Sequence, residues 1–488
     1  MASRTAEIVD ALRRAGLLVA ERGPLPAMLE GITDDSRTVR GGTLFLAVRG
    51  SERDGHEYLT MAASAGATCA MVDDPERTDL PVLVVRDTRR AAAVAAAAFY
   101  GHPASDLRLV AVTGTNGKTT TVGMLRHVLD APAPRSASIG TLGVLVGSEG
   151  VPLDGGSGLT TPGPVELQRV LRALHDQGVR AVAMETSSHA LHQNRVEGLK
   201  FEAGVFTNFT RDHLDYHETM EAYLAAKATL VSLLTPDGTA VINADDIAWR
   251  ALPGAPRTVR FGMEGDGDVQ ALERQYSSHG STWDLVVGLA HHRVELPLSG
   301  DFNIANALAA AAAAWAVGMA PAAIASRLST MPQVPGRLER ITELPTVLRD
   351  YAHTPDALAR ALDAVRPFTT GRLIAVFGCG GDRDRGKRPE MGRIAEGHAD
   401  YAIVTSDNPR TEDPERILDD IEAGMSLGRH ARVEDRRTAI SQAIHSAQPG
   451  DVILLAGKGH ETYQIRGTVK YPFDERVIAR DIISEGHT

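Results

Sequence analysis

The stretch AVTGTNGKTTTVGML at residues 111–125 carries residue types that can hold the phosphates of a nucleotide. Glycines let backbone N–H groups curl around phosphate oxygens, and the N-terminus of a following helix adds a partial positive charge. Lys118 would reach the β- and γ-phosphates, and the Thr119 hydroxyl would bind Mg²⁺. Val112 occupies the first glycine position of the strict pattern, but the strand–turn–helix context still predicts ATP binding. The predicted ATP-binding residues of this turn are Gly114, Thr115, Asn116, Gly117, Lys118, Thr119 and Thr120.

A carboxylate, two histidines and a lysine form a second group of candidates. Glu185 ends the apolar run AVAME, and with the Thr119 hydroxyl it makes a reasonable Mg²⁺ site. His213 and His217 are less usual Mg²⁺ ligands, and each taken singly is more often satisfied or solvated. Lys227 lies among alanines in YLAAKATL, where local sequence favours an ammonium that reaches water. The alternative is a buried lysine of depressed pKa, which can react with CO₂ to give a metal-binding carbamate.

The turn DNPR at residues 407–410 places an arginine among carboxylates, directly after the apolar run YAIVT. Asx-Pro turns that cap a helix are common, so a strand-to-helix connection with a solvated arginine is the ordinary interpretation. A guanidinium can instead bind a carboxylate through two parallel hydrogen bonds. The turn alone leaves both interpretations open.

These candidate residues follow short apolar runs that alternate with helical patterns. Such alternation predicts an α/β fold with parallel sheets, whose ligands bind at the carboxyl ends of the strands. The predicted strands are LVAVT (109–113), AVAME (181–185), AGVFT (203–207), TAVIN (239–243), LIAVF (373–377), YAIVT (401–405) and DVILLA (451–456). The chemistry is therefore expected in the polar loops just after them.

Two breaks divide the 488 residues into three ranges. YGHPASDLRL (100–109) connects an alanine-rich helical pattern to an apolar strand, and STMPQVPGRLERI (329–341) contains two prolines and a glycine. The predicted domains are 1–104, 105–335 and 336–488, in agreement with the number expected from length.

Composition excludes several classes of protein. The net charge of −11 argues against nucleic acid or an anionic membrane as the main partner. Two cysteines, Cys69 and Cys379, imply no disulfide framework and fit a reducing cytosol. The N-terminal stretch is an amphipathic helical pattern without a signal-peptide core, and polar residues interrupt the alanine tracts. A cytoplasmic protein without membrane insertion is expected.

Taken in chain order, the motifs resemble the Mur ligases, ATP-dependent ligases of bacterial peptidoglycan synthesis. The motifs are GTNGKTT, TTP (160–162), METSSH (184–189), RVEG (195–198), TNFTRDHLDYH (207–217), AYLAAK (222–227), DFNIANALAA (301–310), DYAHTP (350–355), GGDRDRGKRP (380–389), DNPR and GKGHE (457–461). The resemblance covers nearly the whole chain. It implies an N-terminal domain for the UDP end of the substrate, a central P-loop ATPase and a Rossmann-like C-terminal domain for the incoming amino acid. A monomer is expected.

The resemblance also implies roles for individual residues. Contacts with the UDP-MurNAc-dipeptide fall on Ser36, Thr160, Thr161, Ser187, Gln193 and Arg195. The metal ligands would be Thr119, Glu185, His213 and Lys227 as a carbamate, and the catalytic residues Lys118, Lys227 and His213. Asn306, Arg337 and Asp350 match positions that contact the adenosine end of ATP.

Within the resemblance, the DNPR turn favours members that add meso-diaminopimelate to UDP-MurNAc-L-Ala-D-Glu. This amino acid carries two ammonium and two carboxylate groups, whereas L-lysine lacks the distal carboxylate. Arg410, helped by Arg383, is suited to that carboxylate. The residues predicted to complete the site are Asp407, Asn408, Gly457 and Glu461.

Three alternatives define the competing hypotheses. A lysine-adding relative predicts a different turn at 407–410, and a folylpolyglutamate synthetase has no use for a UDP-binding domain. A P-loop switch or binding protein would hydrolyse ATP without any amino acid, and it leaves the TTP, RDHLDYH and DNPR motifs unexplained.

Overall fold

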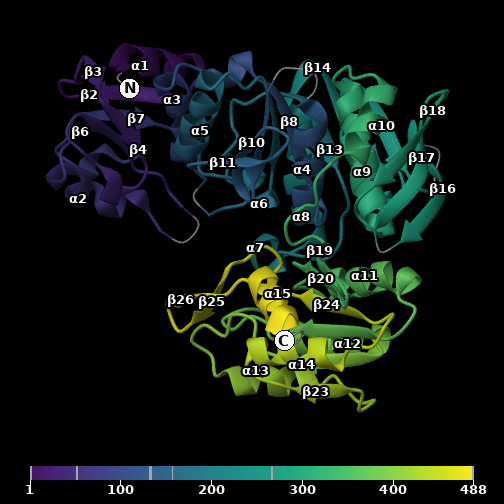
Figure 1. Cartoon of the computed structure of the whole chain (residues 1–488). Helices are drawn as coiled ribbons and strands as arrows, with labels where there is room; N and C mark the ends of the chain where they lie inside the picture. The colour runs from purple at the N-terminus through teal and green to yellow at the C-terminus, as the bar shows by residue number, and fades with distance from the viewer. Residues whose placement is uncertain are drawn as a thin grey trace. The chain divides into compact units, whose positions relative to one another are not determined.

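The computed structural model describes residues 3–50, 53–130, 135–156, 158–264, 267–277 and 279–485. The chain forms two compact units, one of Met1–Val269 and Ala309–Ile324, the other of Gln270–Leu308 and Ala325–Thr488. Figure 1 shows sheets flanked by helices along the whole chain, and the predicted α/β fold class is confirmed. No helix in the described part combines the length and hydropathy that crossing a bilayer requires.

The N-terminal part of the first unit is a five-stranded sheet in the order β2-β7-β6-β5-β4. Its strands are β2 (Leu18–Arg22), β4 (Gly31–Thr33), β5 (Thr43–Leu46), β6 (Ala67–Val72) and β7 (Val82–Val85), and β1 (Ser3–Arg4) pairs separately with β3 (Met28–Leu29). The helices are α1 (Thr5–Arg14), α2 (Leu59–Ser64) and α3 (Thr88–Phe99). β4 to β7 are parallel, and the apolar faces of α1 and α3 share one buried core with the strands.

The larger sheet of the first unit carries the phosphate turn. Within the first unit its strands lie in the order β11-β10-β9-β12-β8-β13-β14-β15. They are β8 (Arg108–Thr113), β9 (Ser136–Gly140), β10 (Gly143–Val146), β11 (Val151–Leu153), β12 (Ala181–Glu185), β13 (Phe201–Phe206), β14 (Leu234–Asn243) and β15 (Arg257–Gly262). The helices are α4 (Lys118–Leu129), α5 (Pro164–Asp176), α6 (Ser188–His192), α7 (Leu214–His217) and α8 (Met220–Ala228). β12, β8 and β13 are neighbouring parallel strands, so the loops after them meet at one edge.

The C-terminal part of the second unit is a doubly covered sheet in the order β19-β20-β24-β21-β22-β23. Its strands are β19 (Glu339–Glu343), β20 (Thr346–Asp350), β21 (Leu373–Phe377), β22 (Tyr401–Val404), β23 (His430–Arg432) and β24 (Val452–Ala456). All neighbours are parallel except β19 and β20. One face packs on α11 (Pro355–Val365), α12 (Lys387–His398) and α13 (Pro414–Glu422), and the other on α14 (Arg436–Ser446) and α15 (Glu475–Glu485).

The remaining elements complete the two units. The second unit also contains the hairpin β25 (Tyr463–Arg466) and β26 (Val469–Pro472), and the strands β17 (Gly280–Val287) and β18 (Ala290–Leu296) follow β16 (Val269–Ser277). The helices α9 (Asp301–Ala316) and α10 (Pro321–Ser329) contribute residues to both units.

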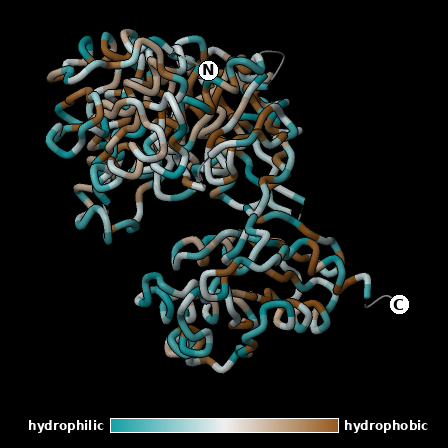
Figure 2. The backbone as a smooth tube through the Cα atoms, turned by 90° about the vertical axis from the view of Figure 1, so that its left-hand side faces the viewer, coloured by the Kyte–Doolittle hydropathy of each residue, from teal (hydrophilic) through white to brown (hydrophobic). Residues whose placement is uncertain are grey.

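Every apolar run predicted as a strand is one, with ends that differ by a few residues. Along β21, Leu373 and Phe377 pack into the core on one face of the sheet, and Ile374 and Val376 into the core on the other. Because helices cover both faces, such a strand is continuously apolar, and the tube in Figure 2 is brown where hydrophobic runs of this kind occur.

A buried carboxylate on α12 gives a pH-dependent prediction for stability. Glu396 is 3% exposed and accepts N–H groups of Ser426 (2.6 Å), Leu427 (2.8 Å) and Arg429 (3.3 Å). Burial by itself raises the pKa of Glu396, but these N–H groups outweigh it and lower the pKa from 4.5 to about 2. The ionised form is therefore the one that stabilises the fold. Its contribution is complete above pH 4.5 and is lost as the pH falls through about 2.

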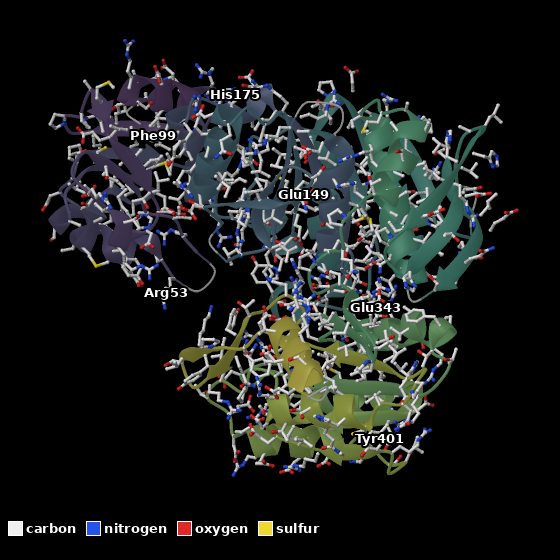
Figure 3. The ribbon with its side chains drawn as sticks, in the orientation of Figure 1. Arg53, Phe99, Glu149, His175, Glu343 and Tyr401 are labelled. Atoms are coloured by element: carbon white, nitrogen blue, oxygen red, sulfur yellow. The ribbon has the colours of Figure 1, made fainter. Side chains whose placement is uncertain are left out.

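We expect Glu396→Gln to lower the thermal midpoint at neutral pH and to approach the parent protein as the medium is acidified. Glu343→Gln is the matched control, because the Glu343 side chain (labelled in Figure 3) is 71% exposed on the same unit. A deficit of Glu396→Gln that is the same at every pH would contradict the prediction.

Candidate active site

The phosphate turn is held open by the loop that follows β13. Gly114 has φ 147° and Gly117 has φ 84°, values that favour glycine, and a Cβ at residue 114 would collide with the hydroxyl of Thr207. That hydroxyl donates to the carbonyl of Asn116 (2.7 Å). Asn208 accepts the N–H of Thr115 on its carbonyl (2.7 Å) and the N–H of Asn116 on its side-chain oxygen (2.8 Å). The turn is therefore preorganised, with α4 starting at Lys118 and the buried Thr119 and Thr120 next in line.

Two lysines converge on this turn. Lys118 Nζ donates to the carbonyls of Gly114 (3.1 Å) and Thr115 (2.8 Å). Lys227 Nζ, from α8, donates to the same Gly114 carbonyl (2.7 Å) and lies 4.4 Å from the centre of the Tyr223 ring. The Gly114 carbonyl thus accepts hydrogen bonds from two lysines, so Lys227 lies directly beside the phosphate turn and the charge of Lys118.

Lys227 is 1% exposed, so the interpretation favoured by local sequence, an ammonium that reaches water, is wrong. Burial, and next the charge of Lys118, lowers the pKa of Lys227 well below 10.5. The physical reason is that α8 packs the side of the helix that carries Lys227 against the phosphate turn. The two segments are distant in sequence, so only the tertiary structure brings them together. Lys227 thus has the environment that carbamate formation requires.

Glu185 occupies the carboxyl end of β12 and is 1% exposed. Its Oε1 accepts the N–H of Thr141 (2.8 Å), and a Cβ at Gly140 would collide with the same carboxylate. The Thr141 hydroxyl lies 3.3 Å from both Glu185 Oε2 and Thr160 Oγ1. Thr141 was not among the predicted residues, because nothing in its local sequence marks it.

The residues predicted to contact the dipeptide form one network beside Glu185. Thr161 Oγ1 donates to the Glu185 carbonyl (2.9 Å) and accepts the N–H of Ser187 (3.1 Å). Arg195 donates to the Thr161 carbonyl (3.0 Å) and to Gln193 Oε1 (2.6 Å). These residues come from three separate loops, and the structure brings them together.

Ser36 is buried at the start of a short helical turn of the N-terminal sheet. The loop before Ser36 lies close to the loop after Thr161: a Cβ built on Gly163 would be 3.8 Å from Asp34 Oδ2. Gln193 Nε2 extends the network in the other direction by donating to the Tyr216 hydroxyl (3.0 Å).

Aromatic and imidazole rings surround His213. The ring lies 4.8 Å from His189 and 5.9 Å from Tyr223, and His189 lies 4.2 Å from Tyr216. Burial lowers the pKa of His213, and it lowers those of His189 and His217 to about 4. All three are therefore neutral at physiological pH, the form in which imidazole binds a metal. His217 is satisfied by Ser188 Oγ (3.0 Å), as expected of a single histidine.

Sequence reasoning missed His189 and Tyr216 as functional candidates, although both stand inside the quoted METSSH and TNFTRDHLDYH motifs. In the part of the chain that the structure describes, no group of three or more histidine, cysteine, aspartate or glutamate side chains is placed to hold a metal ion. Thr119 and a modified lysine lie outside that class of ligands.

In the second unit, Arg337 and Asp350 lie close to Tyr351. The Arg337 guanidinium is 4.8 Å from the centre of the Tyr351 ring, and Asp350 accepts the N–H groups of Leu338 (2.7 Å) and Ala352 (2.8 Å). Burial raises the pKa of Asp350 against the opposing effect of Arg337. Asn306 is buried in α9.

The DNPR turn has an unusual backbone. Arg410 has φ 54° and is paired through its N–H and carbonyl with Ile465 (3.1 Å) and Gly467 (2.7 Å) of the hairpin. Its Nη1 donates to the carbonyl of Gly381 (2.8 Å). A Cβ at Gly380 would lie 2.9 Å from Arg410 Nη1 and 3.7 Å from Cγ of the exposed Arg383, so both arginines flank this loop.

Asp407 and Asn408 are buried beside the GKGHE loop. Asn408 donates to Glu461 Oε2 (2.8 Å), and a Cβ at Gly457 would lie 2.9 Å from Asp407 Oδ2. Lys458, fully buried, donates to Asn408 Oδ1 (3.2 Å) and Glu461 Oε2 (3.1 Å). Among the described residues, no donor forms a hydrogen bond with the buried Asp407 Oδ1. Lys458 was missed, although GKGHE was quoted, because its partner Asn408 lies 50 residues earlier in the sequence.

Comparisons with known proteins agree along the chain. Three family models match: "Mur ligase middle domain" at residues 112–314, "Mur ligase, glutamate ligase domain" at 336–459 and "Mur ligase family, catalytic domain" at 29–116. The chain is 44% identical to the UDP-N-acetylmuramoyl-L-alanyl-D-glutamate--2,6-diaminopimelate ligase of Geobacillus kaustophilus, over 92% of this chain and 94% of the relative. It is 46% identical to the ligase of the same name from Geobacter metallireducens, over 93% and 94%.

One solved structure supports the same family, and two more distant ones share the fold. A structure titled as a UDP-N-acetylmuramoyl-L-alanyl-D-glutamate--2,6-diaminopimelate ligase matches with TM-score 0.71 and 34% identity, over 100% of both chains. A MurF ligase of Thermotoga maritima in complex with ADP (TM-score 0.66, 18% identity, 93% of this chain and 97% of that one) shares the fold. A folylpolyglutamate synthase of Mycobacterium tuberculosis (TM-score 0.63, 22% identity) does so over 76% of this chain and 92% of its own.

Proposed function

The chain belongs to the Mur ligase family, and from that premise we propose that it joins meso-diaminopimelate to the γ-carboxylate of D-glutamate in UDP-MurNAc-L-Ala-D-Glu, with ATP consumed. The observation that carries the choice of amino acid is the DNPR turn. There Arg410 follows the buried Asp407, whose Oδ1 accepts no hydrogen bond from the described residues. A guanidinium and a carboxylate three residues apart complement the carboxylate and ammonium of one amino-acid centre.

The distal centre of the substrate would lie between these groups. Arg410 has five N–H donors and uses Nη1 on Gly381, so others can bind the distal carboxylate. Asp407 and Glu461 would accept the distal ammonium, with Asn408 and the Gly457 backbone beside them. Arg383, exposed at the edge of the same loop, would add a second and weaker attraction for the carboxylate.

The reaction would occur in two steps. The γ-phosphoryl group passes from ATP to the γ-carboxylate, which gives an acyl phosphate and ADP. Lys118 balances the charge on the transferred group, and the N–H groups of residues 114 to 119 hold the phosphates. The amine of diaminopimelate then attacks the acyl carbon, loses its proton, and expels inorganic phosphate as the amide forms. Thr160, Thr161, Ser187, Gln193 and Arg195 would orient the carboxylate for this step.

Mg²⁺ fits the groups beside the phosphate turn. Thr119 and Glu185 supply the buried oxygens that the ion prefers, His213 is neutral, and a carbamate on Lys227 would add two more oxygens. When bound, the ion would neutralise phosphate charge. Asn306, Arg337 and Asp350 would contact the adenosine end of ATP.

We further propose that Lys227 is carbamylated. Its neutral amine adds to CO₂ to form the N–C bond, and the product loses a proton to give the carbamate. Protein exchanged into ¹³C-bicarbonate is expected to show one carbamate carbon resonance that is missing from Lys227→Met. Lys200→Met, an exposed lysine of the same unit, is expected to keep the resonance. A spectrum that is identical for all three proteins would contradict the proposal.

The remaining predictions fit this function. Residues 1–104 would bind the UDP end, 105–335 the ATP and 336–488 the amino acid, in a cytoplasmic monomer that binds neither nucleic acid nor membrane. The substrate is a nucleotide-linked precursor, which suits such a location.

The test is phosphate release with ATP, Mg²⁺ and UDP-MurNAc-L-Ala-D-Glu, in three arms that contain meso-diaminopimelate, L-lysine or no amino acid. We expect rapid release with diaminopimelate alone. Equal release with lysine would support a lysine-adding relative, and release that ignores the amino acid would support an ATP-dependent switch.

A further inference from the structure

Lys458 is a fully buried cation surrounded by residues that the proposed function assigns to the substrate. Its Nζ lies 3.1 Å from Glu461 Oε2, 3.2 Å from Asn408 Oδ1 and 3.7 Å from Asp407 Oδ1. The side chain has 0% exposure, whereas the side chains of Asp407 and Glu461 are 9% and 16% exposed. Lys458 therefore links all three groups and is itself less exposed than either carboxylate.

Burying an ammonium is costly unless its partners recover the lost hydration. Here the partners are two carboxylates and one amide, and all three are candidate ligands of the same substrate centre. The buried ammonium of Lys458 offsets part of the negative charge of the two carboxylates, and it thereby changes which ligand charges they can bind.

The charges of this group match one kind of ligand. The distal centre of diaminopimelate carries one ammonium and one carboxylate, so its net charge is zero. The net charge of the protein groups is also zero, because two carboxylates, Asp407 and Glu461, are balanced by two cations, Lys458 and Arg410. Arg383 is exposed, so water screens its charge. The side chain of lysine ends instead in a lone ammonium of charge +1. Protein groups with a net charge of −1 would complement that ammonium better than groups with a net charge of zero.

We propose, on the basis of the proposed function, that Lys458 is a specificity-determining residue: it holds Asp407, Asn408 and Glu461 in place and removes one unit of negative charge, so that the pocket favours a zwitterionic amino-acid end over a lone ammonium. Without Lys458 the same groups have a net charge of −1. Diaminopimelate would then lose a positioned site, whereas lysine would lose positioning but gain charge complementarity.

The experiment measures kcat/KM for diaminopimelate and for lysine in parent and Lys458→Met protein, with enzyme at concentrations that give a measurable lysine rate. Methionine keeps the length and apolar stem of lysine without its charge. We expect diaminopimelate kcat/KM to fall about 30-fold and lysine kcat/KM by less than about threefold, since only the former loses its charge balance. KM for ATP should stay near the parent value.

Lys470→Met is the matched control. Lys470 and Lys458 lie 4.2 and 5.8 Å from the same Tyr463 ring, but Lys470 is exposed on β26. Lys458→Arg keeps the cation and is expected to keep the selectivity even where its rate falls. If Lys458→Met does not fold, Lys458→Gln tests the same loss of charge.

An equal loss of kcat/KM for diaminopimelate and lysine would show that Lys458 only positions its neighbours, and it would overturn the proposal. An unchanged ratio of the two kcat/KM values in Lys458→Met or Lys458→Gln would also overturn it. These outcomes are separate from failure of the proposed function. A parent protein that releases no additional phosphate with diaminopimelate would contradict the function itself, whatever the variants do.

Discussion

Lys118→Met is expected to lower kcat with ATP and diaminopimelate by about 10³-fold, because the variant removes a positive charge from the place where phosphoryl charge develops. Lys118 opens α4, and its Nζ lies against the Gly114 and Thr115 carbonyls, 3.1 and 2.8 Å away. A methionine can follow the same path without the ammonium. Stability should change little, since Lys118 is only half-buried.

The measurement compares single-turnover and steady-state phosphate release, so that binding and chemistry are separated. Lys200→Met serves as the control, because this exposed lysine of the same unit donates to the Ser232 carbonyl instead. A Lys118→Met protein that keeps more than about a tenth of the parent kcat would remove Lys118 from the phosphoryl-transfer step.

Arg410→Ala is expected to lower kcat/KM for diaminopimelate by about 10²-fold or more, while the slow reaction with lysine stays nearly constant. Diaminopimelate loses a bidentate, charge-assisted partner. Lysine has no distal carboxylate, so in the parent protein it leaves the half-buried guanidinium without a ligand partner, and the variant relieves that cost.

Arg410→Lys tests geometry against charge. It keeps the cation but not the planar pair of donors, so an intermediate loss is expected. Arg383→Ala is the matched comparison on the neighbouring loop, and its exposed side chain should matter less. If Arg410→Ala lowered kcat/KM equally for diaminopimelate and lysine, the turn would be a structural element, and the distal carboxylate would need another partner.

The Arg410 variants and Lys458→Met examine one site from its two sides. Arg410 acts on the carboxylate of the substrate, and Lys458 acts on the groups that hold the ammonium. Arg410 Nη1 donates to the Gly381 carbonyl, whereas Lys458 donates to Asn408 and Glu461, but both charges belong to the set around one substrate centre. Their effects on diaminopimelate kcat/KM should therefore be coupled, so that the loss in the double variant differs from the sum of the single losses.

Local patterns made much of the fold predictable. The apolar run Leu373–Phe377 faces helices on both sides, and its continuous hydrophobicity shows that burial in the sequence itself. The phosphate turn was also recognisable from a local pattern, because Gly114 and Gly117 adopt backbone angles that favour glycine. The roles given to Thr160, Asn306 or Asp407 came from the order of motifs along the chain, and they remain predictions.

The hairpin of β25 and β26 at residues 463–472 was not predicted, because no local pattern marked it. It fixes the DNPR turn through Ile465 and Gly467, which pair with Arg410, while Gln464 donates to the Asp407 carbonyl (2.8 Å). These hydrogen bonds join groups more than 50 residues apart in the sequence, and the 57 residues between Asp407 and Gln464 leave no local pattern that would predict the contact.

By itself the sequence determined the parallel α/β strands, the phosphate turn and the family, because each depends on residue types within a short window or on their order. The tertiary structure alone decided the states of two lysines. Lys227 is buried because it meets Gly114, 113 residues earlier in the chain, and Lys458 because it meets Asn408, 50 residues earlier. Whether a lysine lies in water or in the interior depends on what packs over it, and a residue's immediate neighbours in sequence carry little information about that.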